Sequence, residues 1–241
     1  MVRVAFVIGD YPPEERRRRE QAALSFASKD VEVGIVSVGA TPYVLGLTPA
    51  EIMLVAPTFI DAFRKAEAEG YDAIVPLGTL DLGVDGARCV VDIPVIGPTE
   101  AMLHVASLVG DRFGGMVYHD KLLTMMQAIV RRYGMEHKMA GWRTTGFDLP
   151  DIAANSTAMQ DNFIGRAREL IDDEKCDVIL ALGITQCPVH MRPDWLADKL
   201  GVPVIEGIGA PIRIAAMFAS LGIKHSRVRW PKSQTFAPKS A

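Results

Sequence analysis

The chain has 241 residues, of which 49% are hydrophobic, and a formal net charge of −3 with a pI near 6.0. This weak acidic balance gives no general attraction to nucleic acid or to an anionic membrane. The sequence also contains no run of about 18 apolar residues, the length needed to span a bilayer. The three cysteines (Cys89, Cys176, Cys187) lack the spacing of a zinc site or a disulfide framework, so we expect a protein of the reducing cytoplasm.

Short runs rich in β-branched residues alternate with longer amphipathic stretches. The runs predict buried strands and the stretches predict helices. In chain order, we expect strands at 2–9, 31–39, 71–78, 93–97, 112–118, 176–183 and 202–207. The expected helices cover 12–29, 48–70 (with a kink or break at Pro57), 98–110, 120–134, 155–175, 192–201 and 209–222. Strands that alternate with helices indicate parallel sheets covered on both faces.

A repeated unit indicates the domain organisation. DAIVPLGT (72–79) precedes DIPVIGPTEA (92–101), and DVILALGIT (177–185) precedes GVPVIEGIGA (201–210). Thr79 and Thr185 are 106 residues apart (185 − 79), which indicates a duplicated lobe and not a short-period solenoid. We predict an α/β fold of two similar lobes, each a parallel sheet flanked by helices, with pseudo-twofold symmetry and the site in the cleft between them. The expected boundaries are 1–97 plus 206–225, 98–205, and a tail at 226–241.

Three other stretches are interpreted by their composition. Residues 141–156 lack regular periodicity and are expected to form a loop over the cleft. The basic end, 224–241, is either a loosely ordered terminus or a flap or subunit contact made through Trp230. Arg16–Arg19 share a predicted helix with several acidic residues, so we expect a solvated face and not a nucleic-acid patch.

The two repeated turns have a chemistry of their own. Backbone N–H groups that follow a strand and precede a helix favour negative charge, and the hydroxyls of Thr79 and Thr185 would add donors. Such a site suits a carboxylate, or an enediolate formed beside one. Many α/β strands also end in Gly–Thr for turn geometry alone, so each turn taken singly has a purely structural explanation.

The segments VDIPVIGPTEAMLHVASLVGDRF (91–113) and LGVPVIEGIGAPIRIA (200–215), together with the two turns, resemble the aspartate/glutamate/hydantoin racemase superfamily. The DIPVIG segment is nearest to hydantoin and allantoin racemases. VYHDKLL (117–123) looks more like maleate isomerases and arylmalonate decarboxylases. The resemblance covers most of the chain, from Val2 to about Leu221. It implies two α/β lobes, no metal or organic cofactor, and two cysteines that face each other across the reacting carbon of the substrate.

This sequence departs from the family pattern where those cysteines are expected. The first Cys–Thr is Gly78–Thr79 and the second is Ile184–Thr185. Arylmalonate decarboxylases also have Gly–Thr at the first position, and a tyrosine aligned with Tyr118 contributes to their oxyanion pocket. The resemblance therefore implies that Thr79 and Tyr118 bind a carboxylate or enediolate, with Gly78, Ile184 and Thr185 beside them.

Other residues are candidates for the missing acid or base. The loop after Ile184 carries Gln186, a possible substrate contact. Cys187 in the same loop is either catalytic or a buried packing residue. His190 is either catalytic or a surface residue. Asp81 could act as a base or cap its own turn. Asp10 and Glu206 end predicted strands and are candidate substrate contacts. Asp81, His190 and Glu206 have no metal-ligand spacing, so we expect no metal.

Three functions remain open at this level. We expect first a cofactor-independent racemase or isomerase that acts through a carbanion or enediolate on a small carboxylate, a hydantoin-like imide or an amide. The alternatives are a decarboxylase, lyase or hydrolase on the same scaffold, and a non-catalytic binder of small carboxylates. We also expect a homo-oligomer, with no nucleic-acid or membrane partner.

Overall fold

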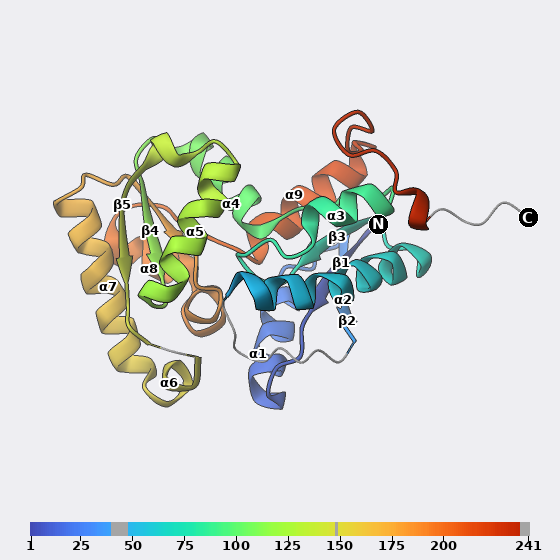
Figure 1. The fold of residues 1–241 in the computed structure, drawn as a ribbon. Helices are drawn as coiled ribbons and strands as arrows, with labels where there is room; N and C mark the ends of the chain where they lie inside the picture. The colour runs from blue at the N-terminus through green and yellow to red at the C-terminus, as the bar shows by residue number, and fades with distance from the viewer. Residues whose placement is uncertain (40–47, 148, 237–241) are drawn as a thin grey trace, which may run out of the picture. The chain divides into compact units, whose positions relative to one another are not determined.

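The computed structural model describes residues 1–39, 48–147 and 149–236 (Figure 1). The chain forms two compact units. Unit 1 consists of Met1–Leu77, Asp81–Gly97 and Pro211–Ala241, and unit 2 consists of Gly78–Leu80 and Pro98–Ala210. Unit 2 thus includes Gly78–Leu80 and residues 206–210, which the sequence-based boundaries placed in the first lobe, and the C-terminal segment groups with unit 1.

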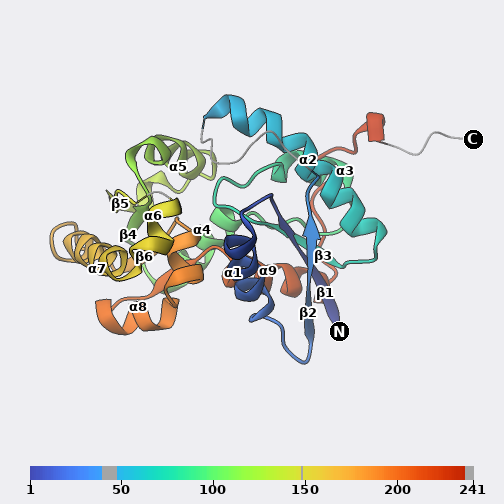
Figure 2. The ribbon, with the colours of Figure 1, turned by 90° about the horizontal axis from the view of Figure 1, so that it is seen from below.

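Unit 1 is built on a parallel sheet of β1 (Val2–Ile8), β2 (Val31–Ser37) and β3 (Ala73–Pro76) in the order β2-β1-β3. Its helices are α1 (Pro13–Leu24), α2 (Pro49–Ala68), α3 (Val84–Val90) and α9 (Gly209–Ser220), and η3 (Gln234–Phe236) is a final turn. Figure 2 shows α2 and α3 on one face of the sheet and α1 and α9 on the other. The central strand β1 is covered on both faces, which explains its unbroken apolar run.

Unit 2 repeats this topology with one more regular strand. Its strands β4 (Phe113–Val117), β5 (Met139–Thr144), β6 (Val178–Ala181) and β7 (Val204–Glu206) are parallel in the order β5-β4-β6-β7. Its helices are α4 (Pro98–Val109), α5 (Asp120–Arg132), α6 (Leu149–Ala154), α7 (Ser156–Asp172) and α8 (Pro193–Leu200). A 3-10 turn, η1 (Glu136–Lys138), and a π-helical turn, η2 (Thr185–His190), complete the unit. In Figure 1, β4 and β5 lie between α7 and α5. The prediction of two similar helix-flanked parallel sheets is confirmed.

The prediction of a loop at 141–156 is wrong, because β5 and α6 occupy most of it. Every residue of β5 is only partly buried, so the strand lacks the apolar run that marks its neighbours. Two glycines leave room for side chains that pack closely at this strand pair. A Cβ on Gly115 of β4 would lie 2.4 Å from the Trp142 ring, and one on Gly141 would lie 2.8 Å from Leu170 Cδ2. Close packing of a side chain on the backbone of a glycine leaves no hydrophobic periodicity in the sequence, so this strand could not be predicted from such a pattern.

The strand predicted at 93–97 makes only an isolated parallel bridge between Ile74 and Val95. Ile74 N–H donates to Pro94 O at 2.8 Å, and Ile96 N–H donates to Ile74 O at 2.9 Å. The N–H of Val95 turns away from the sheet and donates to His225 Nε2 at 2.8 Å. The segment is therefore an edge whose outward donor is taken by the C-terminal part of the chain.

Two further sequence-based expectations concern unit 1. The break that the sequence allowed at Pro57 does not occur, because α2 is one helix from Pro49 to Ala68. The expected solvated face is wrong at Arg19, which is only 1% exposed. Its Nη1 donates to Glu15 Oε2 at 2.5 Å, and its guanidinium lies 4.2 Å from the Tyr11 ring centroid. A planar cation can be buried when a carboxylate and an aromatic face replace its water.

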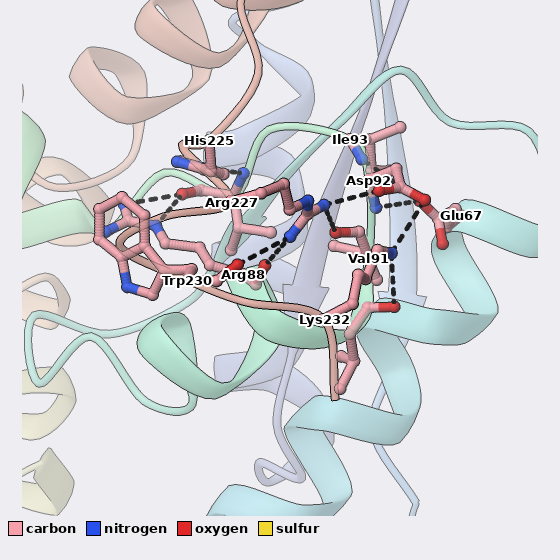
Figure 3. Close-up of polar contacts among 11 residues, drawn as sticks. Glu67, Arg88, Val91, Asp92, Ile93, His225, Arg227, Trp230 and Lys232 are labelled. Atoms are coloured by element: carbon pink, nitrogen blue, oxygen red, sulfur yellow. Dashed lines mark hydrogen bonds and ion pairs between the residues drawn. The ribbon is translucent and has the colours of Figure 1, made fainter. Parts of the chain in front are cut away.

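The C-terminal segment packs on α3 through charge-assisted hydrogen bonds (Figure 3). Arg227 donates to Arg88 O at 2.6 Å, to Val91 O at 2.7 Å and to Asp92 Oδ1 at 2.6 Å. The first two acceptors lie at the C-terminal end of α3, where carbonyl groups lack helical partners and favour a cation. Trp230 Nε1 donates to Asp85 Oδ1 at 3.2 Å. The described part of the predicted tail is therefore bound to unit 1, and residues 237–241 lie outside the described residues.

Replacing Arg227 with Ala should lower the free energy of unfolding by about 1–2 kcal/mol, because the α3 carbonyls lose a charged donor that is only partly exposed to water. Urea denaturation measures the change. Lys224→Ala, which removes an exposed cation three residues earlier, is the matched control and should change stability by less than about 0.5 kcal/mol. Equal effects of the two variants would contradict this interpretation of the segment.

Candidate functional site

The turn after β6 is closed by its own backbone and by Tyr118. The N–H groups of Gln186 and Cys187 donate to Gly183 O at 2.9 and 3.1 Å. Thr185 N–H donates to the Tyr118 hydroxyl oxygen at 2.6 Å. The N–H groups of Thr185, Gln186 and Cys187 therefore have protein acceptors.

Tyr118 can reach this turn only because residue 183 is glycine. A Cβ on Gly183 would lie 2.8 Å from Tyr118 Cε1 and 3.0 Å from Gln186 Oε1. Gln186 Nε2 also donates to Thr145 Oγ1, which in turn donates to Tyr118 O at 3.2 Å. Thr145 lies in the stretch interpreted as a loop, so sequence reasoning missed it. The hydrogen-bonded chain from the Gln186 amide through the Thr145 hydroxyl to the Tyr118 carbonyl joins residues far apart in sequence, so no sequence pattern reveals it.

Thr79 fixes the segment Gly78–Leu80 within unit 2. Its hydroxyl donates to Leu182 O at 2.8 Å, and its own carbonyl accepts a hydrogen bond from Thr99 Oγ1 at 2.5 Å. A Cβ on Gly207 would lie 3.3 Å from Thr79 Cγ2 and 3.4 Å from Ile184 Cδ1. Thr79 and Ile184 thus lie against the same glycine, and the structure brings the two repeated turns together in unit 2.

The segment Gly78–Leu80 leaves its backbone donors open. Among the described residues, none accepts a hydrogen bond from the N–H of Gly78, Thr79 or Leu80. Gly78 has φ +114°, a conformation that L side chains rarely adopt, and no described atom lies within 4 Å of the position of a Cβ there. Consecutive unpaired N–H groups beside open space form a site that favours an anion or a developing oxyanion.

Glu206, expected to face the substrate, instead caps α9. Its carboxylate accepts hydrogen bonds from the N–H groups of Ile208 and Gly209, each at 2.7 Å, and of Ala210 at 3.3 Å. Burial raises the pKa of Glu206 above its ordinary value, and these three N–H groups oppose that rise. The carboxylate is occupied by the backbone of its own helix.

Cys187 lies in the core of unit 2, with an exposed fraction of 0%, among side chains such as Met116, Ile179 and Leu196. Burial raises the pKa of its thiol well above the ordinary value, and the negative charges of Glu206 and Asp194 add to that rise. The thiol is therefore neutral near pH 7, whereas thiolates are the reactive form. This environment favours the packing role that the sequence left open.

His190 lines a surface hollow of about 450 Å³ together with Met191 and Arg192 and with residues of α7 and α8: Gln160, Asp194, Trp195 and Asp198. Neither Thr79, Tyr118 nor Thr185 lines this hollow. The sequence placed His190 beside Ile184 because the two share one loop, but the chain carries it to the end of that loop and into different surroundings.

The remaining candidates lie in unit 1. Asp10 is exposed at the end of β1. Asp81 is 3% exposed and has φ 51°, a left-handed conformation that Asp tolerates better than most residues. A Cβ on Gly97 would lie 2.5 Å from Asp81 Oδ2, so the carboxylate rests against bare backbone. Asp81 directly follows the open N–H groups in the chain.

In the parts of the chain that the structure describes, no three or more His, Cys, Asp or Glu side chains are grouped so that they could hold a metal ion. Likewise, none of the described helices has the length and apolar character needed to cross a membrane.

Comparison with known proteins identifies the family. The family model for Asp/Glu/Hydantoin racemase matches residues 19–215. The chain is 30% identical over 210 residues to a hydantoin racemase of Pseudomonas sp. (strain NS671), which covers 87% of this chain and 83% of that protein. It is 27% identical to a hydantoin racemase of Paenarthrobacter aurescens, over 70% of each chain. The chain therefore belongs to the Asp/Glu/hydantoin racemase family, as its sequence predicted. It is an enzyme of the isomerase class, of racemase type.

Solved structures give the same fold. Allantoin racemase from Klebsiella pneumoniae matches with a TM-score of 0.85 at 21% identity, over 99% of this chain and 97% of that chain. Unliganded arylmalonate decarboxylase matches with a TM-score of 0.61 at 15% identity, over 97% of this chain and 100% of that one. At such low identities the likeness shows the fold alone.

Replacing Glu206 with Gln should change how stability depends on pH. Because the folded pKa of Glu206 is raised, the folded state binds more protons than the unfolded state above about pH 4.3, the ordinary value for Glu. The free energy of unfolding of the wild type, relative to Glu206→Gln, should therefore fall as pH rises from 4 towards 8. Urea denaturation at several pH values tests this, and a difference that stays constant or grows with pH would contradict it.

The folded protein should protect Cys187 from thiol reagents. Burial raises the pKa of Cys187, and that of Cys176 to about 11, whereas Cys89 is only partly buried and serves as the internal control. Alkylation of Cys187 at pH 8 should be slower than that of Cys89 by about two orders of magnitude or more, since it requires local opening. Mass mapping of the alkylated peptides measures both rates, and equal rates would restore Cys187 as a candidate thiolate.

Proposed function

We propose that this enzyme racemises a hydantoin-like cyclic imide or amide at the carbon next to a ring carbonyl. The support is of two kinds. Relatives at 30% and 27% identity are named hydantoin racemases and align over most of the chain. The N–H groups of Gly78, Thr79 and Leu80 have no acceptor among the described residues, and the Cβ position of Gly78 borders open space; these two facts carry the proposal.

The chemistry follows from the acidity of that carbon. Removal of its proton leaves a carbanion that delocalises into the neighbouring carbonyl, so negative charge develops on oxygen. Donors already aimed at that oxygen stabilise the transition state without reorganising. In this proposal the N–H groups of Gly78, Thr79 and Leu80 bind the oxyanion. A proton from water adds to the opposite face of the carbanion and completes the inversion, while the base returns the proton that it removed to water. No metal or organic cofactor takes part.

Thr79 acts here through its backbone. Its hydroxyl proton is directed to Leu182 O, so the side chain holds the turn and leaves the N–H groups to the ligand. Tyr118, with Ile184 and Thr185, would form the wall opposite Gly78–Leu80 in the same unit. Asp10 stays a prediction as a further substrate contact.

The proton-transferring group replaces thiols, because Gly78 and Ile184 stand where the resemblance places the cysteines of the family. Among the three candidates, Cys187 is a buried neutral thiol and His190 lines a separate hollow. Asp81 remains, since its side chain is largely withdrawn from water and it directly follows Gly78–Leu80, the segment proposed to bind the oxyanion. We therefore propose Asp81 as the base. A homo-oligomeric state and a cytoplasmic location also stay predictions.

Incubation of one enantiomer of a 5-substituted hydantoin with the enzyme in D₂O near pH 7 should abolish optical rotation and place deuterium at C5 (the ring carbon bearing the substituent). Polarimetry and mass spectrometry follow the two changes against a sample without enzyme. Asp81→Asn should lower kcat by about 10²- to 10⁴-fold, the usual contribution of a general base. Asn also tolerates a positive φ, so the turn is kept.

Asp161→Asn is the matched control, because Asp161 is exposed on α7, and it should leave the rate unchanged. Release of carbon dioxide from malonates or of ammonia from amides, without exchange at C5, would replace racemisation by the decarboxylase, lyase or hydrolase alternative. Thermal stabilisation by small carboxylates with no turnover of any substrate would indicate a binder.

A further inference from the structure

Gln186 carries a buried polar group that takes no part in the proposed proton transfer. Its side chain is 0% exposed, and one end of the amide is fixed by a chain of hydrogen bonds. Thr145 Oγ1 donates to Tyr118 O at 3.2 Å and so commits its single proton. It can then only accept from Gln186, which places Nε2 towards Thr145 and Oε1 away from it.

The other end of this amide has no partner. Within the residues that the structure describes, Gln186 Oε1 accepts no hydrogen bond. Buried amide oxygens are hydrogen-bonded in the great majority of proteins, because the loss of water is otherwise uncompensated. The orientation set by Thr145 prevents the amide from turning over to remove the mismatch.

The unpaired oxygen of Gln186 lies close to Gly183 and to the Tyr118 ring. Oε1 is 3.0 Å from the position of a Cβ on Gly183, and Tyr118 Cε1 is 2.8 Å from that same position. Gly183 ends the strand that precedes Ile184, and ligands of parallel α/β sheets lie beyond the carboxyl ends of the strands. An acceptor at this place would meet a donor on the ligand.

We propose that Gln186 is a specificity-determining residue whose Oε1 accepts a hydrogen bond from a ring N–H of the substrate. The inference rests on the proposed function and narrows it. A cyclic imide or amide with an N–H supplies the missing donor. A carboxylate offers only acceptors, which would leave Oε1 unpaired and repelled. Gln186 thus selects N–H-bearing rings over carboxylates.

Contact with Oε1 requires its cover to move, because the atom is shielded from bulk water in this structure. Tyr118 is the partly exposed side chain that packs on the same face of Gly183, and Thr185 N–H holds its hydroxyl at 2.6 Å. In this proposal the entering ring shifts the Tyr118 ring, which stays part of the wall of the site, and the ring N–H then reaches the amide oxygen of Gln186.

The test compares a 5-substituted hydantoin with its two N-methyl derivatives, one at each ring nitrogen. Wild-type enzyme should prefer the parent over one derivative by about 10- to 100-fold in kcat/KM, the range expected when a buried acceptor loses its donor. Gln186→Met, which keeps the chain length but has no amide, should reduce this preference to about threefold or less. Gln186→Leu is the second variant in case the first does not fold, as judged by thermal unfolding.

Thr145→Val is the matched control, because it removes the partner of Nε2 but keeps the Oε1 acceptor. It should lower activity on both substrates and preserve more of the preference than Gln186→Met does. If Gln186→Met racemises the parent yet keeps the wild-type preference, the inference fails and the proposed function stands. The preference would then come from steric exclusion of the N-methyl group, or an enclosed water would satisfy Oε1.

If the wild type exchanges no proton with any of these compounds, the proposed function fails. Calorimetric titration of the wild type and Gln186→Met with the same compounds then decides the inference separately. Tighter binding of the parent by the wild type alone supports it, and equal affinities overturn it.

Discussion

The hydrogen bond from the Thr79 hydroxyl to Leu182 O is the constraint on which the candidate site depends. It joins residues 103 apart in sequence and lies wholly inside the protein, so it fixes three residues of a crossing segment against the end of β6. Strand ends in a parallel sheet leave carbonyl groups without ladder partners, and Thr79 satisfies one of them. Because the side chain is committed in this way, the chemistry of the turn falls to its backbone N–H groups. The threonine that the sequence marked as a donor to ligand is a donor to protein.

Close approach to glycine shapes the rest of this site. Tyr118 and Gln186 pack on Gly183, and Thr79 and Ile184 pack on Gly207. Each glycine lets side chains from distant elements approach closely: a methyl group would collide at Gly183 and would be tightly packed at Gly207. The same device holds Trp142 against Gly115 in the sheet of this unit. Unit 2 therefore positions its polar groups by bare backbone as much as by capping or charge, and these glycines are as much part of the site as the residues that carry functional groups.

Sequence reasoning gave the parallel sheets and their repeat, because buried parallel strands are continuous apolar runs that a single sequence displays directly. It missed β5 and α6, whose half-buried residues carry no such run. Within the site, the repeat located Thr79, Ile184 and Thr185 together, and Gln186 was a candidate because it follows Thr185 in the same loop. It did not show that Glu206 is used by its own helix, that Cys187 is sealed in the core, or that His190 turns away into another hollow. Those facts depend on which partners the fold supplies, and residue type alone does not carry them.

The edge of the sheet in unit 1 shows how the chain handles a general hazard of β structure. A strand at the border of a sheet exposes backbone donors that can recruit a second chain. In the segment around Val95, one such donor ends on the imidazole of His225, and Arg227 anchors the residues that carry that ring. The C-terminal segment thus blunts an aggregation-prone border with side chains in place of an extra strand. Shortening of the chain before His225 would leave that border open to other molecules, a change felt first in solubility during folding.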